Sequence, residues 1–436
     1  MTSHRTVGVR QRTTHPLAMP GFRSLWTGAL VSLTGTQMQF VALPYYVHDR
    51  TGSASATALT AFVQVLPRVA VAPLAGAIAD RVGGRRLLTT SNLALAVVTA
   101  ALCLTPLGAW WAAVAVVGLQ AVLAQLVGPA EHVVLARVVP ADQLAAANSL
   151  SGASHSIARL VGPPSGAVLY ASAGLAGVAL ANAVTFAVAT LIVSRLRDPR
   201  SAPSSSCGAS RIDPAGRSRI GGWQQYRRHR LLRRLLCVLV LTAIGEGLLL
   251  ALLAPYASEV FGSSVALGGI LSCQAAGGIC GAALIARWLP SRLAPAALGW
   301  GCLGCGILLT PLLSYPLVYP ALWPALLLVA VSGVAFAAVA AAQTTVLHLV
   351  PVAEARGRVF GVAAAVSGGA QLMAIAVAGP LADLTTVYVV LLDAPCYLLA
   401  GLLMLLAERS ELTDAPADDG RQRLTTPSSQ RGHIAG

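Results

Sequence analysis

Long apolar segments separated by short polar turns recur along most of the chain. A helix needs roughly 20 apolar residues to cross the hydrocarbon core of a bilayer, and such segments follow one another from Leu25 to Leu406. The pattern predicts an all-α integral membrane protein with twelve spans. We place these spans at residues 24–46, 56–78, 87–106, 110–130, 146–170, 174–195, 235–256, 265–286, 294–313, 320–341, 359–382 and 386–407.

The distribution of arginine predicts the orientation of these spans. Basic residues are enriched in the cytoplasmic loops of membrane proteins. All 30 basic residues are arginines, and all but three fall in predicted cytoplasmic segments if the N-terminus lies inside. The exceptions are Arg50 in an outer loop and Arg68 and Arg159 within spans. A miscounted span would disturb this alternation, so we expect both termini in the cytoplasm.

Composition supports a membrane protein and excludes several other classes. Apolar residues make up 56% of the chain and charged residues 11%, too few to cover a soluble surface. The net charge of +14 would suggest nucleic acid in a soluble protein, but topology explains it here, so we expect no nucleic-acid partner. Without lysine the chain has no Walker A motif and cannot work as a P-loop ATPase.

No catalytic, metal or cofactor site is expected. Cys302 and Cys305 form a CxxC, but inside a glycine-rich span and without a nearby histidine. Cysteine in such a span behaves as a small apolar residue. The histidines are dispersed, and no hydrolytic combination gathers at one membrane depth, so an enzyme is not expected. The polar N-terminal segment lacks the apolar core of a signal peptide.

Residues 197–230 divide the chain into two sets of six spans. This segment is rich in Ser, Gly, Pro and Arg, as flexible linkers are, and residues 223–234 favour a basic helix at the lipid surface. GAIAD at Gly76 and VVP at Pro140 recur as GAALIAR at Gly281 and LVP at Pro351, at nearly equal offsets. We therefore expect two related halves. The predicted parts are a cytoplasmic tail (1–21), a six-helix bundle (22–196), the linker (197–230), a second six-helix bundle (231–407) and a cytoplasmic tail (408–436).

The loop GAIADRVGGRR at residues 76–86 carries a family resemblance. It resembles the signature loop of the major facilitator superfamily, with matches at Gly76, Asp80, Arg81, Gly83 and Arg85, whereas Gly84 replaces the usual basic residue. Glycine permits close helix contact, and an aspartate among arginines at a helix end can form a charge latch between conformations. The alternative is a plain positive-inside anchor, which needs the arginines but not the aspartate or the glycines.

Other segments are similar to the branch of this superfamily that holds siderophore exporters and macrolide-efflux proteins. These segments are residues 22–54, 141–150, 158–166 and 354–362. Thr36 and Asn182 depart from that branch, which often has aspartate at both positions. The resemblance implies two pseudo-symmetric bundles that alternate access to a central cavity lined by spans one, four, seven and ten.

GPPSG at residues 162–166 resembles the span-five motif of antiporters in this superfamily. Gly162, Pro163 and Gly166 would pack against the facing half and limit leakage. The alternative is the ordinary enrichment of Gly and Pro in membrane helices.

Ionisable side chains within spans are costly and are therefore candidate functional residues. Glu246, in span seven, would bind a proton or a cationic substrate, or would pair with an arginine. Arg68 and Arg159 favour structural pairing between the halves over binding of an anionic substrate. Glu131 ends span four beside His132 and either gates the cavity or is solvated. Asp393 lies in span twelve, which is usually peripheral in the implied fold.

Together these features predict a secondary active transporter of the cell membrane, with no cofactor. We expect export of a small amphipathic molecule (a drug, siderophore or secondary metabolite) by proton antiport, with protons and membrane lipids as further partners and a monomer as the working unit. Uptake of a nutrient by the same fold remains an alternative, as does a non-transporting sensor or scaffold.

Overall fold

The computed structural model describes residues 16–104, 110–196, 222–288, 290, 293–319, 321–351 and 355–413. All regular structure in these ranges is helical. The helices are α1 (Pro20–Thr51), α2 (Ala54–Ala70), α3 (Ala72–Val82), α4 (Gly84–Ala101), α5 (Trp110–Val138), α6 (Leu144–Ser194), α7 (Gly222–Arg228), α8 (Arg230–Phe261), α9 (Ser264–Trp288), α10 (Ala294–Ser314), α11 (Leu322–Leu349), α12 (Arg356–Val390) and α13 (Asp393–Thr413).

Nine helices in the described ranges are long and apolar enough to cross a membrane. The prediction of an all-helical membrane protein is thus confirmed, while the number of twelve crossings stays a prediction. Each predicted span overlaps a described helix, and α6 carries two of them. Gly174 interrupts α6 with a φ of 64°, a conformation that glycine adopts without strain.

The same short turn ends α1 and α8. Gly52 follows α1 with a φ of 61°, and its N–H donates to the carbonyl of His48 at 2.8 Å. Gly262 follows α8 with a φ of 63° and donates to Ser258 in the same way. Such left-handed glycines terminate helices because they satisfy the last carbonyls. The repeated turn supports the prediction of related halves.

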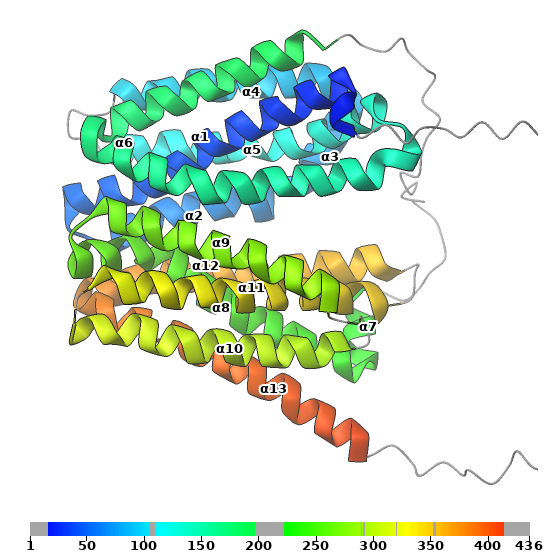
Figure 1. The fold of residues 1–436 in the computed structure, drawn as a ribbon, viewed down its shortest axis with the longest axis vertical. Coiled ribbons are helices and arrows are strands. Elements are labelled where there is room, and N and C mark those ends of the chain that lie inside the picture. The colour runs from blue at the N-terminus through cyan, green and yellow to red at the C-terminus, as the bar shows by residue number, and fades with distance from the viewer. Residues whose placement is uncertain are drawn as a thin grey trace, which may run out of the picture.

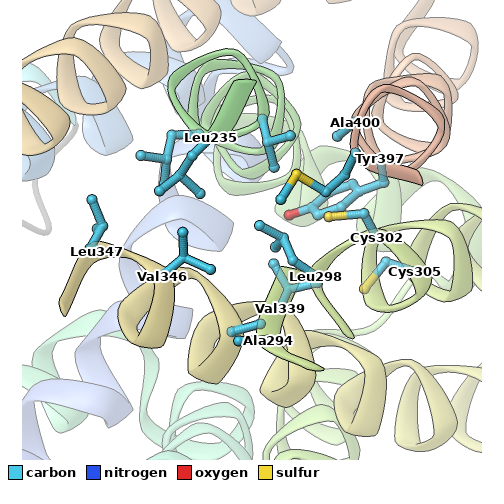
Figure 2. Packing of buried hydrophobic residues seen from close by; sticks show 14 of the residues in the cluster. Leu235, Ala294, Leu298, Cys302, Cys305, Val339, Val346, Leu347, Tyr397 and Ala400 are labelled. Carbon is cyan, nitrogen blue, oxygen red and sulfur yellow. The ribbon is translucent and has the colours of Figure 1, made fainter. Parts of the chain in front are cut away.

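The helices gather in two groups, α1–α6 and α8–α13, which occupy opposite parts of the molecule (Figure 1). Each group has apolar cores of its own. Figure 2 shows the core of the second group, where Leu298 and Val339 pack beside Tyr397 and Cys302. The short helix α7 is anchored to this core, since the Tyr226 hydroxyl donates to the carbonyl of Val359 at 3.0 Å. Burial raises the pKa of Tyr226 to about 12.

The two groups contact each other at one end of the molecule. We call this the turn end, because Gly52 and Gly262 lie there, and the opposite end, where α1, α8 and α12 begin, the linker end. At the turn end, Asp383 of α12 accepts hydrogen bonds from Ser53 and Ser55 beside α2. Ser264 of α9 likewise donates to the carbonyl of Ala167 in α6 at 3.3 Å. Two apolar clusters combine residues of both groups.

At the linker end the described cores stay separate. The cluster around Phe22 and Leu135 contains only residues of the first group, and the cluster around Leu232 and Val359 only residues of the second. Among the described residues, the apolar clusters that join the two groups therefore lie toward the turn end, and none lies at the linker end.

Candidate substrate and proton site

Glu246 lies halfway along α8 between two glycines that allow close packing on both flanks. A Cβ at Gly247 would lie 2.8 Å from the carbonyl oxygen of Gln371 in α12, and one at Gly245 would lie 2.5 Å from Oδ1 of Asp393 in α13. Both glycines are buried, whereas the side chain of Glu246 is exposed. Neighbouring helices thus enclose α8 on the glycine sides and leave the glutamate carboxylate accessible.

Two arginines of the first group face this carboxylate. Arg68 of α2 and Arg159 of α6 are exposed, and both act electrostatically on Glu246. Charges in a low-dielectric surrounding interact over longer distances than charges in water, so the two arginines can influence Glu246 without touching it. None of the three forms a direct ion pair with another described residue. The sequence singled out these residues one by one, and the structure brings them together.

This arrangement carries a net charge of +1 while Glu246 is ionised. Protonation of Glu246 would leave both arginines without a counter-charge. The site can therefore bind a proton, and it can bind a molecule with a charged group whose sign complements the state of Glu246. Such convergent charges at the interface of two repeats are typical of transporter binding sites.

A second, buried set of polar groups lies on the other flank of α8. Asp393 and Tyr397 of α13 are 0% and 1% exposed, and Tyr397 lies beside Cys302 and Cys305 of α10 (Figure 2). Although span twelve is usually peripheral in this fold, α13 packs Asp393 inward against the backbone of α8 at Gly245. Asp393 and Glu246 interact electrostatically.

Glu131 is half-buried on α5. Among the interactions of the described residues, none joins it to Glu246 or to the two arginines. Its role as a gate stays a prediction. Five glutamines within the spans are partly accessible, namely Gln64, Gln125, Gln274, Gln343 and Gln371. The side chain of Gln343 donates to Thr242 of α8 at 3.2 Å.

The signature loop forms the tight junction between α3 and α4. Gly83 makes the turn with a φ of 88°, and Arg85 donates to the carbonyl of Ser194 at the end of α6 at 2.7 Å. A Cβ at Gly84 would lie 2.7 Å from Cβ of Val133, so this close approach to α5 explains why the usual basic residue is missing. Arg81 is exposed. The surroundings of Gly76 and of the Asp80 side chain lie outside the described part, and the latch stays a prediction.

The glycines of GPPSG pack within the first group rather than against the facing half. A Cβ at Gly166 would lie 2.5 Å from Cα of Met38 in α1, and one at Gly162 would lie 3.0 Å from the carbonyl oxygen of Thr34. The expected partner of these two glycines was therefore wrong. The carbonyl of Pro163 does face the second group, 2.9 Å from where a Cβ at Gly268 of α9 would lie.

A chain of buried side-chain hydrogen bonds crosses the first group and was not foreseen. Asn182 of α6 donates to Gln39 of α1 at 2.7 Å, and Gln39 donates to Gln120 of α5 at 2.6 Å. Gln120 in turn donates to Thr99 of α4 at 2.6 Å. Asn182, where an aspartate was the expected residue, is thus one end of an uncharged network. Its members are far apart in sequence, so no local pattern reveals them.

Comparison with known protein families identifies this architecture. The model of the Major Facilitator Superfamily matches residues 25–374. The chain belongs to this superfamily. It is 27% identical over 418 residues to the multidrug efflux pump Tap of Mycolicibacterium fortuitum, covering 91% of this chain and 97% of that relative. It is 24% identical over 185 residues to macrolide efflux protein A of Streptococcus pyogenes, covering 41% of this chain and 45% of that relative.

A solved structure of a bacterial homologue of the iron transporter ferroportin, in an inward-facing state, has the same fold. The TM-score is 0.66 at 15% identity, with 88% of this chain and 98% of that chain covered. As a member of the Major Facilitator Superfamily, the chain is a transporter of small molecules rather than an enzyme, and a multi-pass protein of the cell membrane.

Proposed function

We propose that this superfamily member exports a small amphipathic molecule in exchange for protons, by alternating access between two six-helix bundles. The observation that carries the proposal is the exposed side chain of Glu246 halfway along α8, on which Arg68 and Arg159 of the other group act electrostatically. The names of the relatives, a multidrug efflux pump and a macrolide efflux protein, favour export over uptake.

The proposed topology has twelve crossings. Residues 22–196 and 231–407 form the two bundles, and the tails and the linker 197–230 lie in the cytoplasm, because almost all arginines then lie inside. The linker end is then the cytoplasmic end. Since the apolar clusters that join the groups lie toward the turn end, we infer an inward-facing conformation.

Mutually exclusive binding is what antiport requires. A substrate with a basic nitrogen and a proton compete for the carboxylate of Glu246, because each satisfies the same negative charge. Protons that arrive from the outside release the substrate there, and substrate that arrives from the cytoplasm displaces the proton.

Nutrient uptake is the second candidate, and the arginine pair is the observation that favours it. An anionic substrate would bind Arg68 and Arg159 when Glu246 is protonated, so proton and substrate would travel together. The direction of net flux in whole cells separates the two candidates. A non-transporting sensor would show no flux in either direction.

The proposal is tested in proteoliposomes that contain ethidium, an amphipathic cation, and in parallel erythromycin, a macrolide. A pH gradient should drive either compound against its concentration gradient. Glu246→Gln should lower this flux at least about tenfold, because the exchangeable proton is removed. Glu259→Gln, on the same helix near the turn end, is the matched control and should transport normally. Equal flux in Glu246→Gln and in the unaltered protein would remove Glu246 from the coupling.

A further inference from the structure

The carboxyl group of Asp393 is fully buried, and neither of its oxygens has a hydrogen-bond partner among the described residues. In the part of the chain that the structure describes, the hydroxyl of Tyr397, one helical turn along α13, also has no hydrogen-bond partner. An isolated charge without a partner is very unfavourable in such a place. In this conformation the carboxyl group of Asp393 therefore holds a proton and is neutral.

The groups that face Asp393 supply no positive charge. Glu246 acts on it from α8, the thiol of Cys305 from α10, and Cys396 and Tyr397 from its own helix. Arg68 and Arg159 act on Glu246 instead. Two carboxylates that repel each other, one of them fully buried, cannot both stay ionised at low cost, so the pair is expected to hold one negative charge, on Glu246.

The two carboxyl groups lie on different flanks of α8 at adjacent residues. Asp393 contacts the helix where Gly245 has no side chain, and Glu246 extends into the accessible space between the groups. Asp393 is also the first residue of α13. The positive end of a helix dipole favours an ionised carboxylate, which opposes the effect of burial. Asp393 can therefore adopt either the neutral or the ionised state.

We propose that Asp393 is a second proton-binding residue that exchanges a proton with Glu246 during transport. The proton leaves the carboxyl group of Asp393 and binds the carboxylate of Glu246, so that one acid becomes a carboxylate while the other becomes an acid, and the total charge is unchanged. Asp393 then holds a proton beside the substrate site while Glu246 is occupied by substrate. This inference rests on the proposed function, which assigns proton coupling to Glu246.

The first test needs no substrate. Infrared spectra of the purified, reconstituted protein at neutral pH should contain the carbonyl band of a protonated carboxylic acid. Asp393→Asn, which keeps the shape of the side chain, should lose this band, and Glu246→Gln should keep it. After transfer to deuterated water the band should shift at least about tenfold more slowly in Glu246→Gln, because the route for the proton has been removed. An unaltered protein without the band, or equal exchange rates, would overturn the proposal.

The second test separates coupling from binding. Asp393→Asn should lower pH-gradient-driven ethidium accumulation at least about tenfold, while ethidium counterflow without a gradient stays within about twofold. Unchanged gradient-driven accumulation would refute the exchange. If Asp393→Asn does not assemble, the first test still decides. It compares the rate at which the infrared band shifts in deuterated water between the unaltered protein and Glu246→Gln. If the unaltered protein moves neither ethidium nor erythromycin but passes the infrared test, the proposed function fails and the proton exchange stands.

Discussion

The carboxylate of Asp383 in α12 accepts the backbone N–H of Ser55 in α2 at 3.1 Å. It also accepts the hydroxyl of Ser53, the N-cap residue of α2, at 3.1 Å. A negative charge from the second group thus sits at the positive end of a helix of the first group. This contact helps to hold the turn end closed.

Asp383→Asn should weaken that closure. Loss of the charge should cost about 1 kcal/mol, which changes the ratio of the two conformations by about fivefold in favour of one that is open at the turn end. Spin labels at Ser149 of α6 and Thr344 of α11, both exposed near the linker end, should report a larger population of short distances. Glu259→Gln is the control, since Glu259 accepts from Thr386 within the second group at the same end. Identical distance distributions would contradict the role of Asp383.

Gly166→Ala should destabilise the protein. The new Cβ would lie 2.5 Å from Cα of Met38, and such overpacking costs about 1–3 kcal/mol. Gly152→Ala on the same helix meets no atom within 4 Å and should be neutral or slightly stabilising, since alanine favours a helix. Thermal unfolding in detergent compares the two variants. A midpoint for Gly166→Ala at or above that of Gly152→Ala would show that α1 and α6 separate easily.

Gly84→Arg restores the basic residue that is usual in the signature loop, and we expect it to be harmful. Any Cβ there meets Val133 at 2.7 Å and the carbonyl oxygen of Ala130 at 2.9 Å, which should cost about 1–3 kcal/mol. Val82→Arg, at an exposed position of the same loop, introduces the same side chain without that contact. If both variants unfold at the temperature of the unaltered protein, Gly84 is not required by packing.

Asn182 and Gln39 should be energetically coupled. Asn182→Ala leaves the amide oxygen of buried Gln39 without its donor, at a cost of about 1–3 kcal/mol. A double-mutant cycle with Gln39→Leu should give a coupling of about 0.5–3 kcal/mol. The pair Asn182 and Thr60 serves as control, because Thr60 is buried in α2 and bonds to Thr57 of its own helix. A coupling no larger than in the control pair would mean that the chain of amides is not cooperative.

The sequence was most informative where one residue has one local consequence. Runs of apolar residues predicted every described membrane helix, because length and hydropathy decide whether a helix can cross a bilayer. The charge of Glu246 within an apolar segment was enough to mark it as a candidate.

What sequence could not supply is which helices become neighbours. The partner of Gly166 is Met38 of α1 because α6 lies against α1, and nothing near residue 166 indicates this. Span twelve is usually peripheral, yet Asp393 of this span is buried against α8 because Gly245 has no side chain there. The convergence of Arg68 and Arg159 on Glu246 likewise depends on how the two groups meet.

The turns at Gly52, Gly174 and Gly262 have a practical consequence for structural work on this protein. Each left-handed glycine reverses or bends the chain within one to three residues, so the face formed by these turns offers little exposed loop to an antibody fragment or a protease. Residues 52–53 and 262–263 are the whole connection between their helices. Affinity tags and binding fiducials for microscopy should therefore be placed in the segment 197–221 or at the chain ends, and a synthetic binder raised against the turn face would need a flat, loop-poor epitope.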